Sequence, residues 1–107
     1  MAAIARVRLP PDIKKGDVIE VKTLVTHPME SGQRKDANGQ VIPRKILNKL
    51  VCAYNGKEVF RAELWPAISA NPFITFFLVA GESGSLTFTW TDDDGSTIDH
   101  TEEIHVA

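Results

Sequence analysis

The sequence has few of the residues that metal sites and disulfides require. Its 107 residues include one cysteine, Cys52, which excludes an internal disulfide and a cysteine-rich metal site. There are three histidines, His27, His100 and His105. The last two are an odd number of residues apart, which places them on opposite faces of one strand. Because a metal site needs several converging ligands, we expect no metal and no cofactor.

Positive charge and long apolar runs are also scarce. Lys and Arg total 12 against 14 Asp and Glu, which gives a formal net charge of −2. Proteins that bind nucleic acid or anionic membranes carry clustered positive charge instead. No apolar run approaches the ~20 residues that span a bilayer, and the N-terminal segment has no apolar core of signal-peptide length. We therefore expect no nucleic-acid or membrane partner, and composition alone favours the cytoplasm.

No catalytic constellation is visible. Cys52 lies in the middle of a strand-like run, the usual place of a small buried hydrophobic residue rather than of an activated thiolate. The run Asp92-Asp93-Asp94-Gly95 superficially resembles the start of a calcium loop but lacks the downstream glutamate. Asp-Gly between two alternating runs predicts a hairpin turn instead. The chain is therefore not predicted to be an enzyme.

What the sequence does contain is a series of short β-strand patterns separated by turn signals. We predict strands at residues 4–9, 18–26, 46–54, 57–64, 73–80, 85–91 and 97–106. Asn55-Gly56 is a strong hairpin signal, and Pro10-Pro11 ends the first strand, which we place at a sheet edge. The sequence predicts one all-β domain over residues 1–107, an immunoglobulin-like β-sandwich of about seven antiparallel strands.

The run at residues 73–80, FITFFLVA, is apolar on both faces. One face of each strand in a sandwich normally contacts solvent, so the second apolar face needs a cover. We assign Ile74, Phe76 and Leu78 to that face, which either a partner or another segment of the chain would cover. The predicted partner interface is Trp65, Phe73, Ile74, Phe76 and Leu78.

Residues 27–44 form the longest segment without a regular hydrophobic period. Loops longer than ~12–15 residues are uncommon and are usually functional or disordered. Arg34 and Lys35, with Arg44 and Lys45, could form a positive patch that recognises a small anion or an acidic partner, or they could be ordinary solvated charges. The candidate recognition residues of this loop are His27, Met29, Arg34, Lys35 and Arg44.

Several short motifs occur together along the chain. They are HPMESGQRKD, IPRK, YNGKEVF, SANP before an aromatic strand, and FTWTDDDGS. As an ordered set over residues 18–96 they resemble the SoxZ family of sulfur-oxidation proteins, although none of them is specific alone. The resemblance implies an immunoglobulin-like, non-catalytic subunit of the SoxYZ carrier complex in thiosulfate oxidation.

The resemblance also implies a heterodimer with a SoxY-type carrier subunit. That subunit holds sulfur intermediates covalently on a cysteine in a flexible glycine-rich C-terminal arm and makes transient contact with the enzymes of the Sox pathway. The present chain ends in EEIHVA without a glycine-flanked cysteine, which matches the non-carrying subunit. The family further implies the periplasm, reached by co-export with a signal-bearing partner, in place of the cytoplasm.

An alternative function remains open from the residues themselves. The chain could be a self-sufficient small domain that binds a ligand or metal through the loop around His27. Residues 73–80 would then serve a homodimer.

Overall fold

The structure is a computed structural model that describes residues 4–66, 68 and 70–107. Its regular elements there are all β-strands, and no helix in these ranges is long and apolar enough to cross a membrane. The seven strands are β1 (Ala5–Arg8), β2 (Val18–Val25), β3 (Leu47–Tyr54), β4 (Lys57–Glu63), β5 (Phe73–Val79), β6 (Gly84–Asp92) and β7 (Thr97–Ile104). Each predicted strand is confirmed, with ends that differ by at most two residues.

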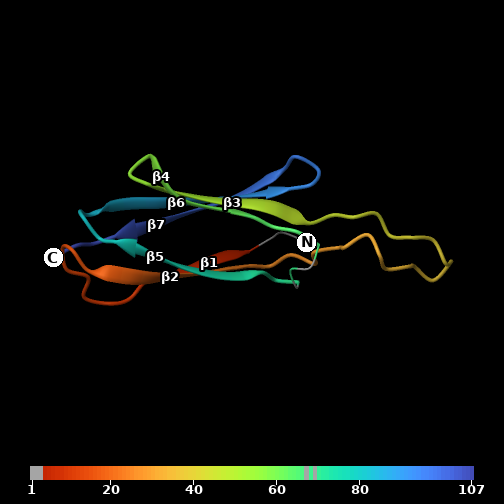
Figure 1. The fold of residues 1–107 in the computed structure, drawn as a ribbon, viewed down its shortest axis with the longest axis horizontal. Coiled ribbons are helices and arrows are strands. Elements are labelled where there is room, and N and C mark those ends of the chain that lie inside the picture. Colours follow the sequence, from red (N-terminus) through yellow and green to blue (C-terminus); the bar gives the residue numbers. More distant parts are fainter. Residues whose placement is uncertain (1–3, 67, 69) are drawn as a thin grey trace.

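The strands form two antiparallel sheets that pack face to face as layers (Figure 1). Sheet I has the order β1-β2-β5, and sheet II has the order β4-β3-β6-β7. The first strand lies at an edge, as Pro10-Pro11 predicted. The architecture confirms an immunoglobulin-like sandwich.

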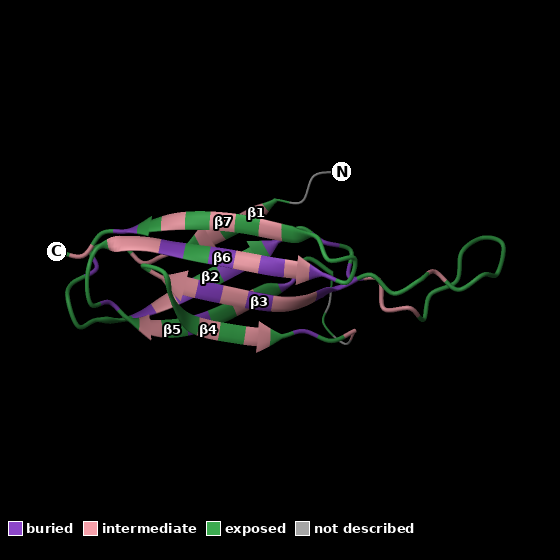
Figure 2. Cartoon of the chain, turned by 90° about the horizontal axis from the view of Figure 1, so that it is seen from above, coloured by how far each residue is buried: buried purple, intermediate pink, exposed green. Residues whose placement is uncertain are grey.

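Alternating side chains build the core between the two sheets. In β6, Leu86, Phe88 and Trp90 are fully buried, and the threonines between them face outward (Figure 2). Phe88 connects the layers: its ring lies 6.1 Å from Trp90 and 6.5 Å from Phe76 of sheet I. Phe76 in turn stacks on Phe60 of sheet II at 4.1 Å. A continuous series of aromatic contacts therefore runs through the core and connects the two sheets.

The predicted Asn55-Gly56 hairpin turn is confirmed by its backbone. Both residues have positive φ, 49° and 84°, as a type I′ turn requires. The Asn55 side chain also accepts a hydrogen bond from the Ser85 N–H at 2.9 Å. Gly84 allows this close approach, because a Cβ there would lie 1.8 Å from the Asn55 Oδ1.

The predicted assignment of the two faces of β5 is wrong and must be reversed. Ile74, Phe76 and Leu78 point into the sandwich, and Phe76 is only 6% exposed. The register explains this, because Phe76 lies opposite the fully buried Val21 of β2 and therefore shares its side of the sheet. Alternation identifies two faces but does not say which one is inward. Sheet II covers these three residues, so they are not a partner surface.

Residues 27–44, called the arm below, project beyond one end of the sandwich (Figure 1). The projection contributes to the elongated shape of the chain, with principal extents of 57 × 22 × 21 Å. The arm is a narrow antiparallel ribbon: Glu30 pairs with Lys45 through two backbone hydrogen bonds, and the Ile42 N–H donates to the Arg34 carbonyl at 2.8 Å. The long loop is therefore an ordered protrusion.

Candidate functional site

The base of the arm is fixed by a buried histidine. The Nδ1 atom of His27 accepts a hydrogen bond from the Met29 N–H at 2.9 Å. Its Nε2 atom therefore carries the ring hydrogen and donates it to Asp92 Oδ2, 2.8 Å away at the end of β6. Both His27 and Asp92 are buried. This contact connects the start of the arm to sheet II.

The loop before β5 holds the same histidine through its backbone. Asn71 accepts a hydrogen bond from the His27 N–H at 2.9 Å and donates its own N–H to the His27 carbonyl at 2.7 Å. Next to it, Met29 has φ of 51°, which is rare for a residue other than glycine. Burial and a contact of its sulfur with the Leu47 N–H hold Met29 in place. Three separate segments therefore set the direction of the arm.

Two aspartates bind the other side of the base of the arm. Asp92 accepts Lys45 Nζ at 3.1 Å in addition to His27. Burial by itself raises the pKa of Asp92, but its hydrogen-bond donors outweigh burial and hold that pKa below the usual value. Asp93 accepts Arg44 Nε at 2.9 Å, and the hydrogen bond from Arg44 is the main cause that lowers the pKa of Asp93 to about 2. Asn48 and the Ile46 N–H donate to it as well.

Because of these contacts, the predicted positive patch is not a group of free cations. Arg34 is paired with Glu30, and Arg44 is paired with Asp93. Among the residues that the structure describes, Lys35 takes part in no ion pair. His27 and Met29 are buried, so in this structure they anchor the arm and do not face a ligand. Recognition by the exposed part of the arm stays a prediction, with Lys35 as its unpaired cation.

The structure offers no cluster of ligating side chains within residues 4–66, 68 and 70–107. No group of three or more His, Cys, Asp and Glu residues there could hold a metal ion. His100 lies on β7, where it contacts Glu102 at 3.0 Å, apart from the His27 pair. Cys52 is free and fully buried, and burial raises its pKa to about 12. Its thiol is therefore protonated at neutral pH and is a poor nucleophile.

The outer side of sheet I carries a row of exposed hydrophobic residues. Val18, Phe73, Phe77 and Val79 are 68%, 61%, 64% and 60% exposed. Val18 lies directly opposite Val79 in the register of β2 and β5, and Leu24 lies opposite Phe73. We call these five residues the apolar face. Val18, Phe77 and Val79 lie together at one end of this row, and Leu24 and Phe73 lie at the other. Between the two ends, Lys22 lies opposite Thr75, and Glu20 lies opposite Phe77.

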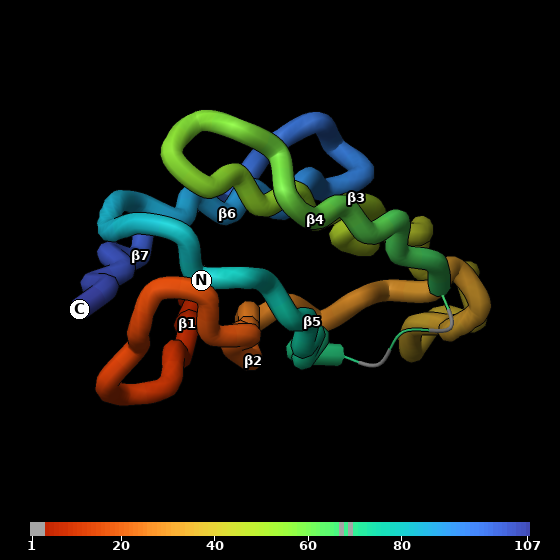
Figure 3. The backbone as a smooth tube through the Cα atoms, turned by 60° about the vertical axis from the view of Figure 1, so that its left-hand side comes forward, coloured from red at the N-terminus to blue at the C-terminus, as the bar shows by residue number. Residues whose placement is uncertain are grey.

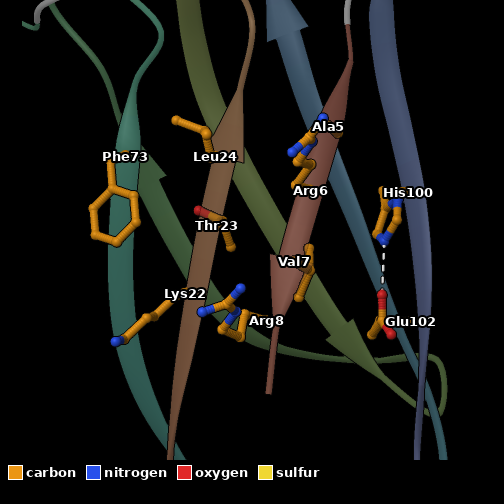
Figure 4. Close-up of a pocket in the computed structure, with 10 residues that line it drawn as sticks. All are labelled: Ala5, Arg6, Val7, Arg8, Lys22, Thr23, Leu24, Phe73, His100 and Glu102. Carbon is orange, nitrogen blue, oxygen red and sulfur yellow. Dashed lines mark hydrogen bonds and ion pairs between the residues drawn. The ribbon is translucent and has the colours of Figure 1, made fainter. Parts of the chain in front are cut away.

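Cationic side chains border the apolar face on the side of β1. Arg6 lies opposite Leu24, and Arg8 lies opposite Lys22, which itself contacts Glu20 at 3.2 Å. Figure 4 shows these cations beside Leu24 and Phe73 around an open hollow of about 620 Å³. The hollow reaches His100 and Glu102 of β7.

Trp65, the remaining predicted interface residue, is exposed beyond the end of β4. It lines a hollow of about 260 Å³ with Arg44 and Asn48, two residues at the base of the arm. The structure therefore leaves Trp65 and Phe73 accessible, as a partner interface requires.

Sequence reasoning did not find three residues that fix the arm. Asp92 and Asp93 were interpreted only as parts of a turn, which the structure confirms, since the Gly95 N–H donates to the Asp92 carbonyl at 2.9 Å. Three successive aspartates are more than a hairpin turn needs, and this excess was the available signal. Asn71 was visible only as part of the SANP motif.

These features define the class of the protein, an immunoglobulin-like β-sandwich with an anchored arm and an exposed apolar face. The family model described as "Sulphur oxidation protein SoxZ" matches residues 7–103. The chain belongs to the SoxZ family and is thus a subunit of the sulfur-oxidation (Sox) system. A search of the curated proteins found no match.

Solved structures share the fold. A superoxide reductase (neelaredoxin) from Ignicoccus hospitalis is similar with a TM-score of 0.71 and 19% identity, over 96% of this chain and 80% of that one. The sulfur carrier protein SoxY from Chlorobium limicola f thiosulfatophilum is similar with a TM-score of 0.66 and 10% identity, over 96% and 78%. At such identities the likeness shows the fold alone.

Proposed function

We propose that the chain is the non-catalytic scaffold subunit of a heterodimer with a SoxY-type carrier, which holds the sulfur intermediates of thiosulfate oxidation. The observation that carries this proposal is the exposed apolar face in a member of the SoxZ family. Monomeric soluble proteins rarely leave large contiguous apolar patches in contact with water. A partner that covers the face explains its exposure in the isolated chain.

The energetics of the apolar face fit such a partner. Fully burying one large apolar side chain contributes roughly 1.5–3 kcal/mol. Phe73, Phe77, Val18 and Val79 are each more than half exposed, so a partner can still gain much of this contribution from each. Their sum is comparable with the cost of association, about 4–15 kcal/mol. Arg6 and Arg8 at the border suit acidic groups on the rim of the partner.

The chemistry of the side chains supports a scaffold without catalysis. Cys52, the single thiol, is buried with a pKa raised to about 12, and the two buried members of the His27–Asp92 pair hold the arm in place. We assign to the arm the transient contacts with the carrier's own flexible segment or with visiting pathway enzymes. Its fixed base supports this role, because an arm of defined direction presents Lys35 at a constant position.

We also propose that the heterodimer acts in the periplasm and that this chain is exported together with a signal-bearing partner. The support is membership of the SoxZ family, for which the sequence resemblance implied this location.

The variant Phe77→Lys tests the interface. Phe77 is 64% exposed on β5, so a lysine is solvated there and the sandwich should still fold. After co-expression with a SoxY-type subunit, we expect the variant to lose the partner in affinity purification, because the partner would have to bury a charged side chain in place of an apolar ring. Thr87→Lys, at an exposed position on β6 on the outer side of sheet II, should retain the partner.

Two results would contradict the interface. One is a Phe77→Lys variant that retains the partner at the level of the unchanged chain. The other is a stable homodimer of the isolated chain, seen by light scattering and lost in Phe77→Lys, which would favour self-association through the same face. Phe76, which was predicted as an interface residue but lies in the core, is unsuitable for this test, because a charge there disrupts its stack on Phe60.

A further inference from the structure

The free edge of β5 is unusual among the edges of this sandwich. An edge strand presents unpaired N–H and C=O groups, so proteins usually protect it with charges, prolines, bulges or short length. Four strands lie at edges here: β1 and β5 in sheet I, and β4 and β7 in sheet II (Figure 3).

Three of the four edges carry such protection. β1 has four residues, of which Arg6 and Arg8 are charged, and Pro10-Pro11 follow it. β4 contains four charged residues, and its pairing with β3 shifts register between Cys52 and Ala53. β7 contains three acidic residues. Each of these edges is a poor template for another strand.

β5 has none of these features. Its seven residues, FITFFLV, include no charge, no proline and no glycine. Its pairing with β2 continues from Leu24–Phe73 to Val18–Val79 without a shift of register. An uncharged and mostly apolar edge of this length, without a bulge, is the kind that pairs with another chain.

The direction of the backbone groups of β5 follows from its ends. The Pro72 carbonyl accepts the Val25 N–H, and the Ala80 N–H donates to the Asp17 carbonyl at 2.8 Å. These even-numbered residues therefore face β2. Backbone groups alternate in an antiparallel ladder, so those of residues 73, 75, 77 and 79 point to the free edge.

The same four residues are the exposed ones. Phe73, Thr75, Phe77 and Val79 all turn their side chains to the outer side of sheet I. A strand added beside β5 would pair with their backbone groups and place its own side chains next to the apolar face. A hollow of about 330 Å³, lined by Val59, Val79 and neighbours, continues the surface past the end of β5.

We propose that the SoxY-type partner contributes one extended strand that pairs with the free edge of β5 and extends sheet I from three strands to four. The pairing strand has about seven residues, apolar at alternate positions, as the length and chemistry of β5 require. This inference rests on the proposed heterodimer and specifies how its subunits join.

A second copy of this chain fits the edge less well. Pairing β5 with its own copy would place two apolar faces side by side on one continuous sheet, where both would still contact water. A different partner can add a strand and also cover the face. The SoxY structure from Chlorobium limicola f thiosulfatophilum has the same fold, so a partner of that kind has edge strands of its own.

The variant Thr75→Pro tests the pairing. Proline removes the outward N–H of residue 75 and obstructs an approaching strand, whereas the hydrogen bonds from β5 to β2 come from the even-numbered residues. In a binding titration with the SoxY-type subunit we expect roughly tenfold or greater loss of affinity. Thr75→Val is the matched control, because it changes the same side chain and keeps the N–H. Equal affinity for folded Thr75→Pro and Thr75→Val would overturn the proposal.

Amide hydrogen exchange on the unchanged chain provides a second measurement that needs no variant to fold. In the free chain the amides of Phe73, Thr75, Phe77 and Val79 should exchange quickly, and in the complex they should become protected. The amides of Ile74, Phe76 and Leu78 should be slow in both states. Binding without new protection at the odd-numbered residues would overturn strand pairing while leaving the heterodimer intact.

Two further outcomes separate this inference from the function on which it rests. If the unchanged chain fails to bind the SoxY-type subunit, the proposed heterodimer is wrong, and the pairing with it. If light scattering shows that the chain alone is a dimer and that Thr75→Pro is a monomer, the occupant of the edge is a second copy, which also overturns the proposal.

Discussion

Asp93 shows how a residue in a surface turn can fix a distant segment. It accepts hydrogen bonds from Arg44 at the end of the arm, from the Ile46 N–H just before β3, and from Asn48 in β3. A carboxylate needs its negative charge to hold three donors well. The lowered pKa of Asp93, about 2, is the measure of that preference.

This pKa predicts a particular dependence of stability on pH. The folded-state pKa is below the usual unfolded value of about 3.9, so the contribution of Asp93 is present above pH ~4 and is lost as pH falls toward about 2. Asp93→Asn should therefore unfold at lower urea concentration than the unchanged chain at pH 7, and the difference should shrink between pH 4 and pH 2. Asp92 is present in both proteins, so the difference between their urea unfolding curves reports the contribution of Asp93 alone.

Asp99→Asn is the control for this measurement, because Asp99 is exposed on β7 and has no ion pair in the described part of the chain. A destabilisation of Asp93→Asn that stays constant from pH 7 to pH 2 would show that the charge of Asp93 contributes nothing.

His27 and Met29 have a structural role that could not be recognised from the sequence. The segment His27-Pro28-Met29 could be singled out because it opens a long loop, but its role as a buried anchor could not be seen. That role depends on Asp92, sixty-five positions away, and on Asn71. Contacts between distant segments have no local signal, so a residue that fixes a loop and one that recognises a ligand look alike in sequence.

At the scale of elements, the strands were predictable because each depends on a local pattern. Alternation in β6 and the positive φ of Asn55-Gly56 follow from neighbouring residues. The inward face of β5 was not predictable, because both of its faces are apolar and the register with β2 decides between them. A strand with two apolar faces thus leaves undetermined which face packs in the core and which is exposed.

The outer part of the arm should contribute to function but little to the stability of the fold. Its outer part, residues 33–42, contacts the rest of the chain mainly through its own ribbon, whereas its base is held by buried contacts. Replacing residues 33–42 with Asn-Gly should change the free energy of unfolding by less than about 1 kcal/mol. It should leave the heterodimer intact and lower thiosulfate-dependent activity of the reconstituted pathway.

Asn71→Ala is the companion variant, because it removes an acceptor at the base and keeps the outer arm. It should lower stability more than the shortened arm does. Unchanged pathway activity with the shortened arm would remove the arm from the proposed contacts with pathway enzymes.

At the scale of the whole molecule, the sandwich places its anchored arm and its apolar face in different positions. The arm leaves one end of the sandwich, and the face lies on the outer side of sheet I (Figure 1). A carrier bound on β5 would therefore leave the outer arm accessible. In the proposed heterodimer, this separation would let one subunit hold a permanent partner and meet transient ones.

The same separation predicts how assembly and export are connected. If the chain reaches the periplasm only with its partner, Phe77→Lys should remain in the cytoplasm although its sandwich is folded, because the variant loses the interface and keeps the core. Cell fractionation after co-expression with the signal-bearing subunit measures this. Thr87→Lys, with the same added charge on the outer side of sheet II, should be exported normally. Periplasmic Phe77→Lys at the level of the control, with no bound partner, would mean that export does not depend on assembly through the apolar face.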